Sequence, residues 1–147
     1  MEFSTDVGDF ISSHRIARFA TTDSSGVPHI IPVCYVFDGA VLYSALDLKP
    51  KRVSVFKLKR VQNILNNSDV ALIVDDYSED WDELAYVLVQ GKAELINDGR
   101  SEQATAEALL RDKYAQYLDF LTEGCPIIKI VPTHFVKWGR VFSEPKY

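Results

Sequence analysis

The chain has 147 residues, of which 47% are hydrophobic and 25% charged, a composition typical of one folded domain over residues 1–147. Its formal net charge of −5 argues against wide contact with nucleic acid, which needs many positive charges along a groove. The apolar runs are too short to span a membrane, and the N-terminal residues show no signal peptide. We therefore expect a cytoplasmic protein that binds neither nucleic acid nor membrane.

The first part of the chain alternates between short apolar segments and turns. A helix is predicted over residues 3–13, covering the open end of a barrel. Its apolar face comprises Phe3, Val7, Phe10 and Ile11. Three strands of an antiparallel meander are predicted over residues 16–22, 28–37 and 41–45. Pro32 lies inside the second strand and cannot donate a backbone hydrogen bond, which predicts a sheet edge or a bulge that is open to a ligand.

Residues 48–68 hold six of the sixteen basic residues and no acidic residue. With +6 in this stretch and −5 overall, the remainder of the chain sums to −11. Pro50 predicts a loop that carries Lys49 and Lys51, and a helix is predicted over residues 56–66. Its apolar seam comprises Leu58, Val61, Ile64 and Leu65, and three side chains project away from that seam: Lys59, Arg60 and Asn63. The pattern fits either a solvated basic face or an anion site.

The second half of the chain predicts long strands and one long helix. Strands are expected over residues 70–75, 84–96, 127–131 and 133–138, and a helix over residues 101–121. Gly91 predicts a bulge or a close backbone approach, Ser101 a helix cap, and Pro132 a break between the last two strands. In total, six or seven short strands with tight turns favour a closed barrel.

Motifs of the common nucleotide-binding and hydrolytic enzymes are absent. The sequence contains no GxGxxG, GxxxxGK[ST], GxSxG or HExxH, and its two cysteines and three histidines show no metal-ligand spacing. Trp81 and Trp138 suit a core or a dimer interface, and Trp81, in the acidic loop over residues 75–83, is also a candidate wall for a flat aromatic ligand. What remains is an anion site on a small barrel, an arrangement in which a bound cofactor supplies the chemistry.

Three segments resemble the FMN-binding split-barrel family of pyridoxamine 5'-phosphate oxidase-like proteins. They are RIARFATTDSSGVPHIIPVCYVFDGAVLYSALDLKPKR, LKRVQNILNNSDVALIVDDYSEDWDELAYVLVQGKAEL and IIKIVPTHFVKW. The most specific blocks are D-x-K-P-K at residues 47–51, K-R-x-x-N-I at residues 59–64 and D-x-Y-x-x-D-W at residues 75–81. Together they resemble the branch of F420-dependent oxidoreductases, over residues 15–138.

The resemblance implies a mainly β fold with inserted helices, a six-stranded antiparallel split β-barrel that forms a homodimer with two cofactor sites between the subunits. The cofactor phosphate would be bound by Lys49, Lys51, Lys59 and Arg60, with Asn63 as a supporting donor. The flavin or deazaflavin ring would lie beside the strand that carries Ile31, Pro32 and Val33, and beside Ser44. Three aromatic residues would close the site, from the same or the partner subunit: Tyr77, Trp81 and Trp138.

Three hypotheses follow for the function. The first is an F420-dependent oxidoreductase that transfers hydride between the deazaflavin and an unsaturated small molecule, with Arg52 and Lys57 near the polyglutamate tail of F420. The second is an FMN-dependent oxidoreductase of the same fold. The third is a protein that binds a flavin, F420 or a tetrapyrrole without turnover. Oxidation of pyridoxamine phosphate is not expected, because the chain lacks the C-terminal extension with which those oxidases recognise their substrate.

Overall fold

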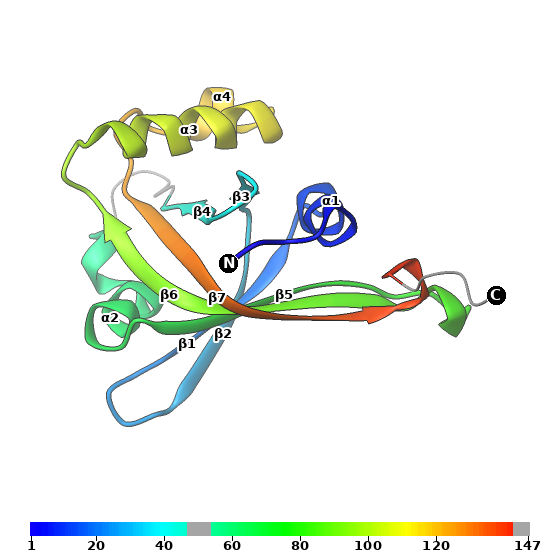
Figure 1. The fold of residues 1–147 in the computed structure, drawn as a ribbon. Helices are drawn as coiled ribbons and strands as arrows, with labels where there is room; N and C mark the ends of the chain where they lie inside the picture. The colour runs from blue at the N-terminus through cyan, green and yellow to red at the C-terminus, as the bar shows by residue number, and fades with distance from the viewer. Residues whose placement is uncertain (47–53, 143–147) are drawn as a thin grey trace.

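The computed structural model describes residues 1–46 and 54–142. Its helices are α1 (Thr5–Ser13), α2 (Lys59–Asn66), α3 (Ser101–Lys113) and α4 (Tyr117–Phe120). Its strands are β1 (Ala17–Thr22), β2 (Pro28–Val33), β3 (Val36–Phe37), β4 (Leu42–Ala45), β5 (Asp69–Asp76), β6 (Ala85–Ile96) and β7 (Ile127–Gly139). All neighbouring strands are antiparallel, in the order β2-β1-β5-β6-β7-β4-β3 (Figure 1).

The sheet curls on itself, as a split barrel requires. Strands β2 and β3 lie at opposite edges of the strand order, yet only Cys34 and Tyr35 separate them in the chain. The two edges must therefore approach each other, and Figure 1 shows the curled sheet that results. The described residues form seven strands, one more than the resemblance implied and within the six or seven expected from the pattern. The strand expected over residues 28–37 breaks at these two residues into one piece for each edge.

The core forms inside this curl. Helix α1 buries Val7, Phe10 and Ile11, which confirms the predicted apolar face, whereas Phe3 precedes the helix and packs against the rings of Phe37 and Phe135. Strand β5 alternates between buried and less buried residues, as expected of a strand whose side chains point alternately to the two faces. None of the helices within the described ranges is long and apolar enough to cross a membrane.

The pairing of β6 with β7 contains the predicted irregularity at Gly91. The register shifts between Gln90 and Gly91, where one extra residue of β7, Thr133, interrupts the ladder. Strand β7 continues through Pro132, so the predicted break there is wrong, because the shifted register accommodates a residue that has no N–H. A Cβ atom on Gly91 would lie 2.4 Å from the carbonyl oxygen of Val131, which confirms the close backbone approach.

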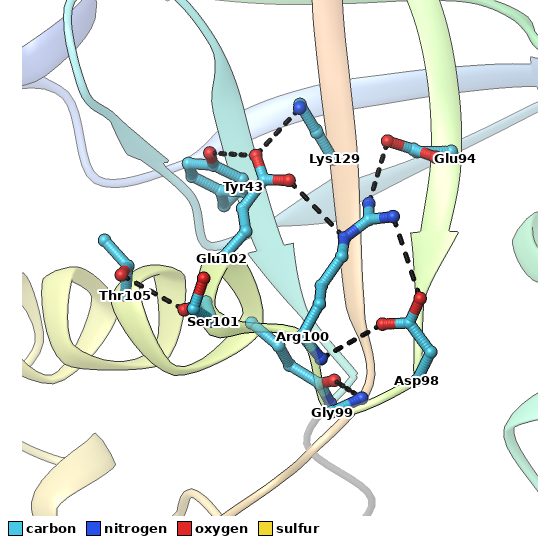
Figure 2. Close-up of polar contacts among 10 residues, drawn as sticks. Tyr43, Glu94, Asp98, Gly99, Arg100, Ser101, Glu102, Thr105 and Lys129 are labelled. Atoms are coloured by element: carbon cyan, nitrogen blue, oxygen red, sulfur yellow. Dashed lines mark hydrogen bonds and ion pairs between the residues drawn. The ribbon is translucent and has the colours of Figure 1, made fainter.

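Polar contacts fix the start of α3 on the sheet (Figure 2). The Tyr43 hydroxyl of β4 donates to Glu102 over 2.7 Å, and the Lys129 ammonium of β7 lies 2.7 Å from the same carboxylate. These hydrogen bonds hold the pKa of Glu102 below its usual value. Arg100 extends the cluster to Glu94 of β6, at 3.0 Å. The N-terminal turn of α3 is therefore attached to three strands.

The long helix predicted over residues 101–121 is interrupted. It begins at Ser101, but Arg100 rather than Ser101 takes the N-cap position, and no side chain caps the helix. Helix α3 ends at Lys113, and three residues, 114–116, separate it from the start of α4 at Tyr117. The Tyr114 hydroxyl lies between them and accepts a hydrogen bond from the Tyr35 N–H over 3.0 Å. Tyr114, where the helix is interrupted, thus provides a hydrogen-bond acceptor for the backbone N–H of Tyr35, in the segment between β2 and β3.

Two glycine-to-alanine substitutions should act in opposite directions. Gly91→Ala should lower the free energy of unfolding by about 2 kcal/mol or more, because the new Cβ would clash with backbone that cannot withdraw. Gly8→Ala, inside α1, would place its Cβ 3.7 Å from the Phe37 ring and should raise stability by about 0.5–1 kcal/mol through helix propensity. Urea unfolding measures both; equal midpoints for Gly91→Ala and the natural chain would contradict the close approach.

Candidate functional site

The structure brings five of the predicted site residues to one cavity of about 270 Å³. Ile31, Pro32 and Val33 line it from β2, Ser44 from β4 and Arg60 from α2. Four further residues complete the lining: Ile16, Cys34, Ala45 and Tyr117. The edge strand β2, strand β4 and helices α2 and α4 therefore meet at a mainly apolar hollow with a guanidinium group in its wall.

The interruption of the strand at Cys34, between β2 and β3, shapes this cavity. The Ser44 hydroxyl donates to the Cys34 carbonyl oxygen over 2.8 Å, so a side chain of β4 holds the interrupted segment in place. Strand β2 pairs with β1 on one side only, which confirms the sheet-edge position predicted for Pro32. The outer backbone of β2 at Ile31–Val33 thus borders the cavity without a neighbouring strand.

Helix α2 buries only part of the predicted seam, and Leu58 packs against the core. Val61 and Ile64 are buried, but Leu65 is 57% exposed and Asn63 is only 1% exposed. The Asn63 amide nitrogen donates over 2.9 Å to the Thr21 hydroxyl of β1, and this bond allows a polar side chain to replace the leucine in the core. The predicted outward projection of Asn63 is therefore wrong, and its amide anchors the helix that carries Arg60. The helix expected from residue 56 begins at Lys59, after a 3₁₀ turn.

Lys59, one of the lysines predicted to bind the phosphate beside Arg60, lies near a carboxylate. The Lys59 ammonium is half exposed and lies 3.8 Å from the Asp23 carboxylate. The Val27 N–H and, more weakly, the Lys59 ammonium hold the pKa of Asp23 below its usual value. Lys49 and Lys51 lie outside the described residues.

The three predicted aromatic residues lie at another part of the molecule. Trp81 and Trp138 line a cavity of about 430 Å³ together with Lys137 and Arg140, and Tyr77 lines a separate cavity. In the sheet, Ser44 pairs with Ile128, and Trp138 lies ten residues further along β7. At about 3.3 Å per residue, the two positions are separated by up to about 30 Å along the strand. Within one chain these aromatic residues do not close the cavity at Arg60.

A second cavity of about 590 Å³ adjoins the first and was not predicted. Ile16, Cys34 and Tyr117 line both cavities. The other residues of the second cavity come from the start of β1 and the junction of α3 and α4: Arg15, Asp112, Lys113, Tyr114, Ala115 and Gln116. The sequence predicts a continuous helix over residues 101–121, which includes residues 112–116, and no local signal marks the interruption that turns them toward Cys34.

Lys113 is the most perturbed cation of this cavity. Its ammonium donates to the His14 carbonyl oxygen over 2.6 Å and lies 4.0 Å from the centre of the Tyr35 ring. Burial and, to a smaller extent, the neighbouring Arg15 guanidinium lower the pKa of Lys113 to about 8. Burial also raises the pKa of the Tyr114 hydroxyl to about 12, so this group remains a neutral hydrogen-bonding partner. Over residues 1–46 and 54–142, no group of three His, Cys, Asp or Glu side chains could bind a metal ion.

The curled sheet, with a cavity beside its open edge strand β2, is that of a split-barrel protein. The chain belongs to the pyridoxamine 5'-phosphate oxidase family, whose sequence model matches residues 3–130. A comparison with curated proteins finds no match.

Proteins of known structure with this fold have names that mention different cofactors: haem, FAD and F420. The haem storage protein HutZ from Vibrio cholerae has 12% identity and a TM-score of 0.72, over 95% of this chain and 98% of that one. An FAD-binding protein from Mesorhizobium loti has 17% identity and a TM-score of 0.68, over 92% and 94%. An F420 reductase has 23% identity and a TM-score of 0.64, over 87% and 94%. At these identities the likeness establishes the fold.

The lowered pKa of Lys113 predicts a pH dependence of stability. The folded chain releases this proton near pH 8, whereas an unfolded lysine keeps it to about pH 10.4. Between these values the unfolded state binds more protons, so the free energy of unfolding should rise with pH, by on the order of 1 kcal/mol for a half-exposed group. Urea unfolding between pH 7 and 10 measures the effect as the difference between the natural chain and Lys113→Met. A difference that stays constant with pH would contradict the burial of the ammonium.

Proposed function

We propose that the chain is an F420-dependent oxidoreductase that transfers hydride between the deazaflavin and an unsaturated small molecule. The observation that carries the proposal is the cavity where Arg60 of α2 meets the open edge of β2 and Ser44 of β4. An apolar wall, an open backbone edge and one fixed guanidinium suit a flat ring that is linked to a phosphate.

The donors of this cavity fit such a cofactor. The Arg60 guanidinium can bind phosphate oxygens through paired N–H groups, and the lysines at positions 49 and 51, which precede α2 in the chain, are proposed to add positive charge. Lys59 is close enough to Asp23 that it contributes less free charge. Asn63 is left out of the phosphate site, since its amide is buried against Thr21.

A bound deazaflavin or flavin would supply the hydride chemistry. The residues of this chain bind and orient it: Arg60 would hold the phosphate, the Ile31–Val33 backbone would border the ring edge, and Ile31 and Val33 would exclude water from the ring face. The Ser44 hydroxyl is already engaged with the Cys34 carbonyl, so its role is to hold the wall of the site.

The family and the similar structures leave two alternatives that the same cavity could serve. FMN also carries a phosphate after a ribityl chain, and an FAD-binding protein shares the fold. A haem storage protein shares it as well, which corresponds to binding without turnover. The F420 assignment is supported by the sequence blocks that resemble F420-dependent oxidoreductases and by the shared fold of an F420 reductase.

Side-by-side titration with F420, FMN and haemin tests the proposal. We expect F420 to bind more tightly than FMN or haemin, and Arg60→Ala to weaken F420 binding about tenfold or more, as loss of a charge-assisted hydrogen bond should. Lys49→Ala combined with Lys51→Ala should have a similar effect. Lys92→Ala removes an exposed lysine that pairs with Asp69 and serves as the control. Preferred FMN or haemin binding, or F420 affinity unchanged in both variants, would contradict the assignment.

We propose further that the protein is a homodimer. The cavity at Arg60 is smaller than the roughly 300–1,000 Å³ usual for ligand pockets, so a second surface is needed to enclose a cofactor. An aromatic patch (Tyr77, Trp81, Trp138 and Val141) is 51–71% exposed at the opposite end of the long strands from α2 (Figure 1). Large exposed apolar groups of this kind favour a protein interface, and a partner's patch could supply the wall that this chain's own patch does not.

Sedimentation tests the dimer. We expect the natural chain to sediment as a dimer and Trp81→Ala with Trp138→Ala to shift it toward the monomer, because the two indoles supply most of the apolar area of the aromatic patch. Leu118→Ala, on a side chain of α4 that is 68% exposed, should leave the dimer intact. A natural chain that sediments as a monomer at micromolar concentration would refute the proposal.

A further inference from the structure

The 590 Å³ cavity has a chemical character of its own. Tyr114 and Tyr117 provide aromatic walls, and the cavity shares Ile16, Cys34 and Tyr117 with the neighbouring cavity at Arg60. A molecule in the second cavity would therefore contact a ligand in the first across this common boundary. The volume lies within the range of pockets that bind small organic molecules.

Two cations border this cavity without a carboxylate partner. Among the ion pairs of the described residues, neither Lys113 nor Arg15 is included. The Arg15 guanidinium donates to the Lys113 carbonyl oxygen and lies 5.5 Å from the Tyr114 ring centre. The Lys113 ammonium has three N–H groups, of which the His14 carbonyl accepts one. A partly buried ammonium with donors to spare favours an oxygen ligand that carries negative charge.

We propose that this cavity is the acceptor site for a conjugated carbonyl compound, an enone or quinone, and that Lys113 binds its oxygen and donates the proton that accompanies hydride transfer. The proposal rests on the proposed function for the source of the hydride. It assigns a substrate class and a catalytic residue to the Arg15, Lys113 and Tyr117 side of the groove.

The step balances in electrons and protons. A bound reduced deazaflavin would supply the hydride, with its two electrons; on its addition to the β-carbon of the C=C–C=O unit, the π electrons would shift to the carbonyl oxygen as an enolate. Lys113 Nζ gives one proton to that oxygen, which forms an enol that tautomerises to the saturated ketone. The Lys113 amine then takes a proton from water, so the alkene is reduced and the deazaflavin oxidised.

The charge state of Lys113 suits this role. A proton donor is most effective when its pKa lies near the working pH, and burial lowers the pKa of Lys113 to about 8. The groups that face it are His14, Arg15, Cys34, Tyr35 and Tyr114. Asp112 is its chain neighbour and also lines the cavity. An enolate oxygen would oppose the positive charge of Arg15 and would favour the charged form of Lys113.

Binding of 4-nitrophenol to the cofactor-free protein tests the assignment directly, because its phenolate resembles an enolate oxygen and absorbs differently from the phenol. We expect bound 4-nitrophenol to ionise at lower pH than in solution. Lys113→Met should abolish this shift and weaken phenolate binding about tenfold or more, whereas Lys113→Arg should retain most of the shift because it keeps the charge. Phenolate binding should also decline at the alkaline pH where Lys113 loses its proton.

Matched controls separate the possible outcomes. Lys92→Met, on an exposed lysine of β6, should leave the spectral shift unchanged. An unshifted spectrum in the natural chain, or an equal shift in Lys113→Met, would overturn the proposal, and the first of these results needs no variant that folds. F420 and 4-nitrophenol should bind together, since each cavity has lining residues that the other lacks. Strict competition between them would instead make the second cavity part of the cofactor site.

The same measurements distinguish this inference from the proposed function. If F420 fails to bind while the Lys113-dependent shift persists, the proposed function is wrong and the anion site stands. If F420 binds and no shift occurs, only the acceptor site is wrong. With F420 bound and 4-nitrophenol left out, Lys113→Met should lower kcat for menadione reduction while F420 affinity stays unchanged.

Discussion

The hydroxyl of Tyr114 is the contact on which the arrangement of the open end of the barrel depends. It accepts from the Tyr35 N–H and faces the carbonyl oxygens of Tyr35 and Arg15, at 2.9 and 2.7 Å. The chain leaves β2 at Val33 and reaches the opposite sheet edge at Val36, so the backbone between them has no strand partner. An unsatisfied buried backbone group costs about 1–3 kcal/mol. The Tyr114 hydroxyl avoids this cost by hydrogen bonding backbone groups of Tyr35 and Arg15.

Both cavities follow from that contact. Tyr114 stabilises the segment between β2 and β3, where Cys34 lines both cavities. The interruption of the helix at Tyr114 also brings Tyr117 to both cavities and Lys113 to the larger one. The attachment of α3 through Glu102, Tyr43 and Lys129 fixes the other end of this helix. A helix held at both ends by the sheet can position an ammonium beside a ligand groove more precisely than a free loop could.

Charge is divided between the two sides of the groove. Arg60 on α2 faces the smaller cavity, and Lys113 and Arg15 face the larger one. A cofactor phosphate and an acceptor oxygen would then meet different cations, on the two sides of the residues that line both cavities, Ile16, Cys34 and Tyr117. In a chain of net charge −5, such local positive groups in clefts concentrate anions at the groove rather than over the whole surface.

The sequence by itself determined the antiparallel β architecture, the apolar face of α1, the edge position of Pro32 and the close approach at Gly91, because these depend on local periodicity and on backbone chemistry. The family resemblance singled out Ile31, Pro32, Val33, Ser44 and Arg60, which line one cavity in the structure. Only the tertiary structure decided the burial of Asn63 against Thr21, the interruption of the helix at Tyr114, the place of Lys113 beside Cys34, and the distance of Trp138 from Ser44. Each of these depends on partners far away in the chain, and sequence periodicity reports only which neighbours share a face.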